Sequence, residues 1–151
     1  MLSDVPELTA HLGYWLRRVS NHVSHAFARK LATKDVTVAE WALMRVLHGR
    51  EPTPPSQLAD DMGLTRGAVS KLADRLVGKA LIIREPSPVD GRAHSLKLTK
   101  KGAVLVPELA ALADRNEAEC FAQMPGKDRR TLERILKETV FRLGITAMPI
   151  E

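Results

Sequence analysis

Residues 56–98 constrain the fold of this chain more than any other segment. Ser56 is a favourable N-cap residue and Gly63 a favourable residue just beyond a helix, so the two predict one short helix between them. Thr65 then caps a second helix, whose apolar residues fall on one face: Val69, Leu72, Ala73, Leu76 and Val77. Two helices joined by so short a turn predict a helix-turn-helix unit.

Two strand-like runs follow the second helix. They flank a turn at residues 86–95 that contains the dipeptide Asp90-Gly91, and they read Leu81-Ile82-Ile83 and Leu96-Lys97-Leu98. A hairpin directly after a helix-turn-helix unit is the layout of a winged helix-turn-helix, which typically binds duplex DNA. We therefore expect a mainly α fold with a recognition helix at about residues 65–79 in the major groove and a wing at 86–95 in the minor groove.

Positive charge is concentrated in the same part of the chain. Between Leu64 and Lys101, nine Lys and Arg residues stand against three acidic residues, a local net charge of +6. The whole chain carries +5, so the remainder sums to −1. A basic excess confined to the segment with a groove-sized helix is the electrostatic pattern of phosphate binding. The alternative is a solvated basic face without a partner.

Length and composition narrow the class of protein. The chain of 151 residues has the size of one ordinary domain, or of one domain with helices that need a partner. Its single cysteine excludes an intramolecular disulfide framework and fits a reducing compartment. We see neither an apolar run near 18 residues nor a signal peptide, which predicts a cytoplasmic protein without a membrane span. Motifs of catalysis are missing too, so we expect neither an enzyme nor a cofactor.

Helices are also predicted before this unit. The first runs from about Glu7 to Leu31, and its apolar residues recur at three- and four-residue steps: Leu8, Leu12, Leu16, Val19, Val23 and Phe27. Thr37 and Glu40 have the spacing of a capping box and open the next helix, which runs to Gly49.

Two further helices follow the hairpin. Thr99 caps the first of them, in which Pro107 should cause a kink. The second runs from about Lys127 to Leu143, residues 144–151 form a loose tail, and five residues should point inward: Leu132, Ile135, Leu136, Val140 and Leu143. The terminal helices carry more apolar surface than a small winged domain covers, so we expect a homodimer. Its two recognition helices would lie about 34–36 Å apart and face a pseudo-palindromic operator.

The chain resembles the MarR (multiple antibiotic resistance regulator) family over nearly its whole length. The resemblance rests on SQLADDMGLTRGAVSKLADRLVGKALIIR, on VDGRAHSLKLTKKG and, most specifically, on Asp90-Gly91-Arg92, which matches the Asp-x-Arg signature of the family's wing. It implies a homodimeric regulator, usually a repressor, whose DNA binding weakens when a small, often aromatic or phenolic, molecule binds. The chain then divides into an N-terminal dimerisation helix (1–36), a winged helix-turn-helix (37–98) and C-terminal dimerisation helices (99–151).

The resemblance also implies which residues contact double-stranded DNA. Arg92 would enter the minor groove, and the Asp90 carboxylate would hold its guanidinium in place, which lowers the entropy cost of insertion. Ala80 stands where the family usually has glycine, at a cost of about 1 kcal/mol if the backbone there is left-handed. Four residues of the second helix would face the major groove, with Arg75 at its edge: Thr65, Arg66, Ser70 and Lys71.

A possible effector site involves the first two helices. An aromatic anion would suit aromatic faces beside a cation, which four residues supply: Trp15, Arg18, His22 and Trp41. Packing at the dimer seam explains these residues equally well.

Two alternatives keep the same fold but replace the small-molecule effector by another signal, a metal ion or oxidation. His22 and His25 lie three residues apart, yet no third ligand is spaced for zinc, so we predict no metal site. Cys120 would be a redox sensor only beside an activating cation, and its neighbours Glu117 and Glu119 favour a buried structural thiol. A further alternative is a winged-helix module that binds protein rather than DNA.

Overall fold

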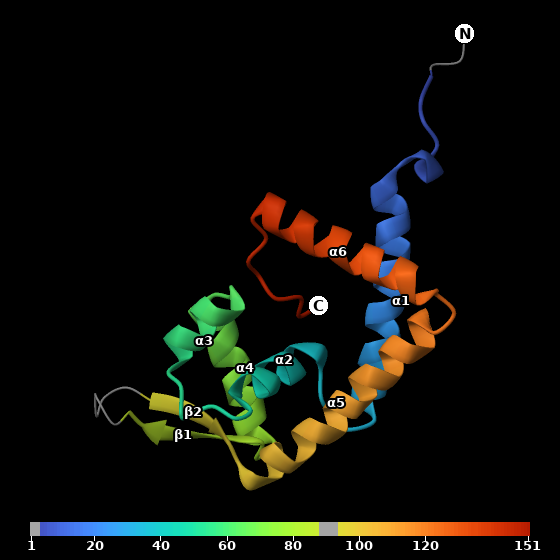
Figure 1. Ribbon diagram of the computed structural model, residues 1–151. Helices are drawn as coiled ribbons and strands as arrows, with labels where there is room; N and C mark the ends of the chain where they lie inside the picture. The colour runs from blue at the N-terminus through green and yellow to red at the C-terminus, as the bar shows by residue number, and fades with distance from the viewer. Residues whose placement is uncertain (1–3, 88–93) are drawn as a thin grey trace.

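A computed structural model describes residues 4–87 and 94–151 of the chain. Asp90 and Arg92, the expected wing-tip pair, lie outside the described residues. The described part is mainly helical, with one small antiparallel sheet, as predicted (Figure 1). In chain order the elements are α1 (Leu12–Ala32), α2 (Val38–Leu47), α3 (Pro55–Met62), α4 (Arg66–Gly78), β1 (Ile82–Pro86), β2 (His94–Leu98), α5 (Lys100–Phe121) and α6 (Gly126–Leu143).

The helix-turn-helix is formed by α3 and α4. Helix α3 begins at Pro55, with Pro54 as its N-cap, so the prediction that Ser56 is the N-cap is wrong by two positions. Proline suits the first helical position because its ring presets φ and the missing amide would have no helical partner there. Gly63 ends the helix in the left-handed conformation, as expected. The Thr65 hydroxyl caps α4 by accepting the Ala68 N–H at 3.1 Å.

The wing strands extend further than the sequence predicted. Ile82 pairs with Leu98 at one end of the sheet, and Pro86 pairs with His94 at the other. Thr53, just before α3, forms an isolated β-bridge with β2: its amide donates to the Leu96 carbonyl at 3.0 Å, and its carbonyl accepts from the Leu96 amide at 2.8 Å. This bridge fixes the chain entering the helix-turn-helix against the wing.

The first helix begins later than its apolar pattern indicated. A 3₁₀ turn covers Leu8–Ala10, and His11, which is extended, is the N-cap of α1. The capping box of α2 is present: the Glu40 amide bonds the Thr37 hydroxyl at 3.1 Å, and the Thr37 amide bonds the Glu40 carboxylate at 3.0 Å. Helix α2 ends at Leu47, slightly before the expected Gly49.

One hydrophobic core lies beneath the helix-turn-helix and the wing. It joins α2, α3, α4, the sheet and the first half of α5, together with the C-terminal end of α1. Helix α5 runs without a break through Pro107. Among the largest fully buried side chains are Leu31, Leu43, Met44, Leu58, Met62, Leu76, Leu96 and Leu109.

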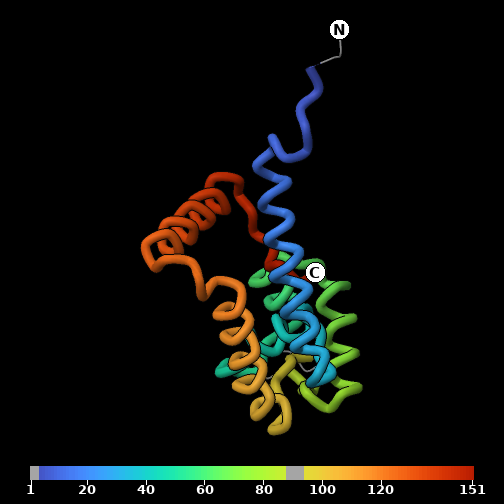
Figure 2. Tube along the Cα trace, turned by 90° about the vertical axis from the view of Figure 1, so that its right-hand side faces the viewer, coloured from blue at the N-terminus to red at the C-terminus, as the bar shows by residue number. Residues whose placement is uncertain are grey.

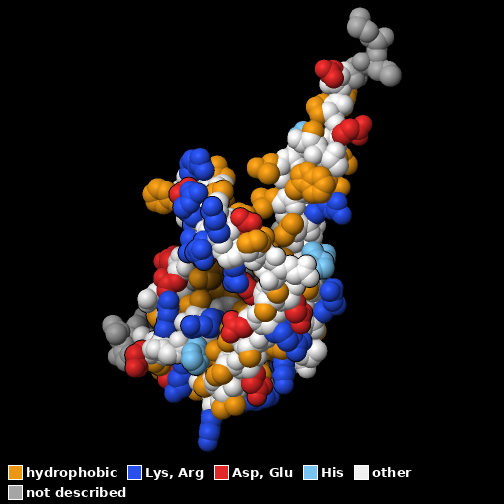
Figure 3. Space-filling model, turned by 45° about the vertical axis from the view of Figure 1, so that its right-hand side comes forward, with side chains coloured by type: hydrophobic (Ala, Val, Ile, Leu, Met, Phe, Trp, Pro, Cys, Tyr) orange, Lys and Arg blue, Asp and Glu red, His pale blue; other side chains and the backbone are white. Residues whose placement is uncertain are grey.

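The N-terminal half of α1 and the whole of α6 lie outside this core. The first projects away from the body, and α6 stands to one side of it (Figures 1 and 2). Helix α6 buries none of its residues, so the five side chains expected to point inward are at least partly exposed in the single chain. Leu12 is 83% exposed, and hydrophobic side chains gather along the projecting end of α1 (Figure 3). These faces are uncovered because one chain supplies nothing to pack on them.

Residues 144–151 are not the loose tail that the sequence predicted. Gly144 ends α6 in the left-handed conformation, and the chain then turns back toward α3. The Met148 amide donates a hydrogen bond to the Met62 carbonyl at 2.9 Å. Across residues 4–87 and 94–151, no helix is both long and apolar enough to cross a membrane.

Candidate nucleic-acid interface

Helix α4, called the recognition helix below, presents its polar residues to solvent. Its buried face consists of Val69, Leu72, Ala73 and Leu76, as the periodicity predicted. The side chains expected at DNA are all exposed: Thr65, Arg66, Ser70, Lys71 and Arg75. The Thr65 hydroxyl accepts a capping bond, and its own proton remains available to a phosphate oxygen.

The cations in this region divide into paired and unpaired groups. Lys79, Arg84 and Lys97 form ion pairs with Glu40, Asp74 and Glu85 respectively. Within the described residues, no ion pair involves any of the three cations on the exposed side of the recognition helix: Arg66, Lys71 and Arg75. Free positive charge is therefore concentrated where a DNA backbone would lie.

The Arg84–Asp74 ion pair joins the wing to the recognition helix. Arg84 lies on β1 and Asp74 on α4, and both side chains are at least partly exposed. On the same hairpin, Lys97 binds Glu85 at 2.8 Å across the two strands. The first pair thus connects the base of the wing to the recognition helix, and the second connects the two strands of the wing.

The turn after the recognition helix is left-handed at a non-glycine residue. Ala80 has φ of +59°, so the left-handed case considered for this position is the one that the structure has. The Ala80 carbonyl accepts the Thr99 hydroxyl at 2.7 Å, and Lys101 donates to the Lys79 carbonyl at 3.2 Å. These bonds from the start of α5 hold a backbone that costs alanine about 1 kcal/mol.

Glu40 is a fully buried acid that connects α2 with the end of the recognition helix. The Lys79 ammonium lies 3.1 and 3.0 Å from its two carboxylate oxygens. Burial by itself would raise the pKa of Glu40, but the bond from the Thr37 amide and the pairing with Lys79 together outweigh it, and the pKa is lowered. The sequence predicted the capping role of Glu40 but did not indicate its pairing with Lys79, which lies 39 residues further along the chain.

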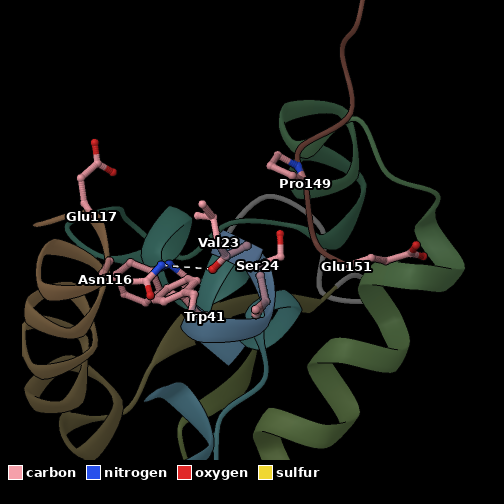
Figure 4. Close-up of a pocket in the computed structure, with 11 residues that line it drawn as sticks. Val23, Ser24, Trp41, Asn116, Glu117, Pro149 and Glu151 are labelled. Carbon is pink, nitrogen blue, oxygen red and sulfur yellow. Dashed lines mark hydrogen bonds between the residues drawn. The ribbon is translucent and has the colours of Figure 1, made fainter. Parts of the chain in front are cut away.

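A first hollow, of about 320 Å³, lies between α1, α2 and α5 (Figure 4). Trp41 lines it together with Phe27 and Val23. Asn116, which is 4% exposed, donates to the Val23 carbonyl at 3.2 Å and accepts from Lys30 at 3.0 Å. This buried amide offers the wall a fixed polar group, and the sequence analysis missed it because an isolated Asn on a helix carries no pattern.

A second hollow, of about 450 Å³, lies on the other side of Val23, between α1 and the end of α5. It contains three of the four predicted effector residues, Trp15, Arg18 and His22, whereas Trp41 lines the first hollow. In the single chain the four residues therefore line two neighbouring hollows rather than one. The Arg18 guanidinium carbon lies 5.7 Å from the ring centroids of both Tyr14 and Trp15.

Cys120 also lines the second hollow. Its side chain is half-buried, not fully buried as we expected. Among the described residues, no group of three or more His, Cys, Asp or Glu is placed to hold a metal ion.

Comparison with known proteins places this geometry among DNA-binding regulators. The sequence profile of the MarR family matches residues 34–93. A Thauera aromatica protein named as a transcriptional regulatory protein for the hcr operon is 29% identical over 89% of this chain and 85% of its own length. The multiple antibiotic resistance protein MarR of Escherichia coli is 25% identical over 91% of this chain and 96% of its own. The structure of a mutant of that MarR in complex with operator DNA is 25% identical, covers 85% of this chain and 93% of the other, and has a TM-score of 0.77.

Proposed function

The chain belongs to the MarR family of transcriptional regulators, and we propose that it is a homodimeric cytoplasmic repressor that releases its operator when a small effector binds. Its role is to bind DNA, without catalysis and without a cofactor. The observation that carries the proposal is the set of unpaired cations on the exposed side of the recognition helix, next to a wing fixed by ion pairs.

In this proposal the recognition helix enters the major groove. Arg66, Ser70 and Lys71 lie on its exposed side, where they reach base edges and phosphates. Thr65 and Arg75, at either end of that side, contact the phosphate backbone. The wing, with Arg92 supported by Asp90, reads the adjacent minor groove. The likeness to a MarR bound to operator DNA supports this orientation.

Salt-dependent binding tests this proposal. Fluorescence anisotropy with a labelled duplex from the region upstream of the gene should give an affinity that falls steeply with salt, with a log–log slope of about −0.9 for each neutralised phosphate. Lys71→Ala should reduce the magnitude of the slope by about one contact. Lys137→Ala, which removes an exposed cation of α6, is the matched control and should leave it unchanged. Binding that is absent or independent of salt contradicts the proposal.

The homodimer would form through the uncovered faces of α1 and α6. Six large apolar residues of α6 are exposed, and those of the projecting end of α1 are exposed as well. Burying both faces would remove this apolar surface from water, which stabilises by about 25 cal/mol per Å². Sedimentation should give twice the chain mass of 16.7 kDa at micromolar concentration. Leu136→Asp, at the centre of the α6 face, should produce monomers that bind DNA much more weakly.

The effector we propose is a small aromatic anion in the second hollow. Arg18 supplies the positive charge there, Trp15 an aromatic face and His22 a further polar group. Trp41 lines the neighbouring hollow, so it would influence this effector only through Val23, which lines both hollows. A ligand at this position, near the expected dimer seam, would change the spacing of the two recognition helices.

Tryptophan fluorescence distinguishes the two hollows. Salicylate should quench Trp15 in a Trp41→Phe variant, and Arg18→Ala should abolish the response while DNA binding persists. An effector typically changes DNA affinity by about 5–150-fold, and by reciprocity DNA must weaken the binding of the effector by the same factor. Quenching that persists in Trp15→Phe and is lost in Trp41→Phe would assign the ligand to the first hollow instead.

A further inference from the structure

Residues 144–151, called the C-terminal strap below, connect α6 to the helix-turn-helix of the same chain. Gly144 turns the chain out of α6, and the Met148 amide bonds the carbonyl of Met62, the last residue of α3, at 2.9 Å. In Figure 1 the strap (red) descends from the end of α6 toward α2 and α3. It thus joins a helix with an exposed apolar face directly to the DNA-binding unit.

The strap lies very close to the turn between α3 and α4. A Cβ atom added at Gly63 would lie 2.5 Å from the Thr146 carbonyl oxygen and 2.7 Å from the Ala147 Cα. Both are backbone atoms, which cannot swing aside as a side chain would. Glycine at position 63 therefore serves two purposes, because it adopts φ of +64° and it leaves room for the strap.

The end of the strap lies beside the recognition helix. Ile150 and Glu151 share a hollow of about 350 Å³ with Lys71 and Arg75. The Glu151 side chain extends toward α4 in Figure 4. No described residue forms an ion pair with Glu151, so its charge acts on these two exposed cations across the hollow rather than by contact.

The same segment borders the first hollow. Pro149 and Glu151 line that hollow opposite Trp41 and Asn116 (Figure 4). The strap therefore separates the hollow between α1, α2 and α5 from the flank of the recognition helix.

We propose that the C-terminal strap is an autoinhibitory element that competes with DNA for the recognition helix. The inference rests on the proposed DNA-binding function of α4. When the strap is docked, Glu151 lowers the positive potential around Lys71 and Arg75 and so weakens their attraction for phosphates. DNA binding in turn displaces the strap, because the docked strap and bound DNA each weaken the binding of the other by the same factor.

Removing the strap's charge is the first test. Glu151→Gln should raise the affinity for the upstream duplex about threefold at 50 mM salt, and less at 300 mM, because salt screens a charge that acts across a solvent-exposed hollow. Glu7→Gln is the matched control: it makes the same change of net charge at an exposed residue of the segment before α1, and Figure 1 shows that this segment projects away from the helix-turn-helix. An equal gain in both variants would overturn the proposal, since it would reflect net charge alone.

Amide hydrogen exchange in the full-length protein is the second test. The Met148 amide should be protected in the free protein, because it is bonded to Met62, and should exchange faster when the upstream duplex is bound. The Leu96 amide, bonded to Thr53 at 2.8 Å, is the internal reference and should remain protected in both states. Unchanged Met148 exchange in DNA-bound protein would overturn the proposal.

Gly63→Ala examines the docking itself. The added methyl group should displace the strap, remove the protection of Met148 and raise DNA affinity, while Gly49→Ala, also left-handed at φ of +77° but with nothing within 4 Å, should leave both unchanged. If Gly63→Ala does not fold, Met148→Pro removes the donor instead, and the same rise in DNA affinity is expected. A chain that binds no duplex refutes the proposed function together with the strap. A wild-type chain that binds DNA, but whose Met148 amide is unprotected in the free protein, refutes the strap alone.

Discussion

The Lys79 ammonium at the end of the recognition helix lies within 3.1 Å of both carboxylate oxygens of Glu40, a fully buried residue in the first turn of α2. Lys79 also donates to the Asp35 carbonyl at 2.6 Å, so it closes the gap between the α1–α2 loop and the recognition helix. Because a buried carboxylate is costly without a cation, this pair fixes how the recognition helix sits against α2.

We predict that replacing Lys79 costs more free energy of unfolding than replacing the Glu40 carboxylate. Lys79→Met leaves the buried Glu40 carboxylate without its cation and should cost about 3 kcal/mol in the free energy of unfolding. Glu40→Gln keeps a side chain that completes the capping box and frees a partly exposed Lys79, so it should cost only about 1 kcal/mol. Urea unfolding measures both. Equal losses would show that burial of Glu40 does not decide the energetics.

The lowered pKa of Glu40 makes part of this stability depend on pH. Its folded pKa lies below the ordinary value of 4.5, so the ionised form is bound more strongly in the folded chain. The stabilisation is present above pH 4.5 and is lost as pH falls through the lower folded pKa. The stability difference between wild type and Glu40→Gln should therefore be constant above about pH 6 and shrink below 4.5. Urea midpoints from pH 7 to pH 3 test this, and a difference that grows in acid would contradict it.

The ion pair between Arg84 and Asp74 should matter for DNA rather than for folding. Arg84→Ala leaves an exposed acid on the recognition helix and frees the base of the wing, so DNA affinity should fall about threefold to tenfold. Adding Asp74→Ala should recover part of the lost affinity, because the repulsion between the Asp74 carboxylate and the DNA phosphates disappears. Arg134→Ala breaks a comparable exposed pair on α6 and should leave affinity unchanged. Anisotropy at one fixed salt concentration compares these variants.

Local signals in the sequence predicted the starts of α2, α4 and α5 well. Thr37, Thr65 and Thr99 each accept an amide three residues ahead, as their positions before apolar periods indicated. The signals for α3 were ambiguous, because Ser56 and Pro55 are both typical of a helix start. Thr53 stands directly before Pro54 and Pro55 and forms a β-bridge with Leu96, which is more than 40 positions further along the chain. A contact over that distance has no local signature in the sequence.

Contacts distant in sequence account for what could not be predicted. Trp15 and Trp41 were grouped by their chemistry as residues of the first two helices, but the packing of α1, α2 and α5 decides which hollow each residue lines. The C-terminal strap has no periodicity, so its packing against Gly63 depends on the direction in which α6 leaves α5. The uncovered faces of α1 and α6 were recognisable as surplus apolar surface, since that follows from counting residues alone.

Ala80 offers a test of backbone strain. Glycine adopts φ of +59° without the crowding that alanine meets there, so Ala80→Gly should stabilise the fold by up to about 1 kcal/mol, less the greater entropy of the unfolded chain. Ala103→Gly, in the first turns of α5, should destabilise by about 1 kcal/mol because the backbone there is helical. Thermal unfolding should thus shift in opposite directions. A loss of stability in both variants would mean that Ala80 is not strained.

The wing signature is best tested by a double-mutant cycle. Arg92→Ala should cost about 1–3 kcal/mol of DNA affinity if Arg92 enters the minor groove. Asp90→Ala should weaken binding through the loss of a fixed Arg92 pose, while thermal unfolding remains unchanged because a wing tip contributes little to the core. Since the pair acts as one unit, the double variant should lose less than the sum of the single losses. Strict additivity would show that Asp90 does not position Arg92, and an Arg92→Ala protein with full affinity would remove the wing from the interface altogether.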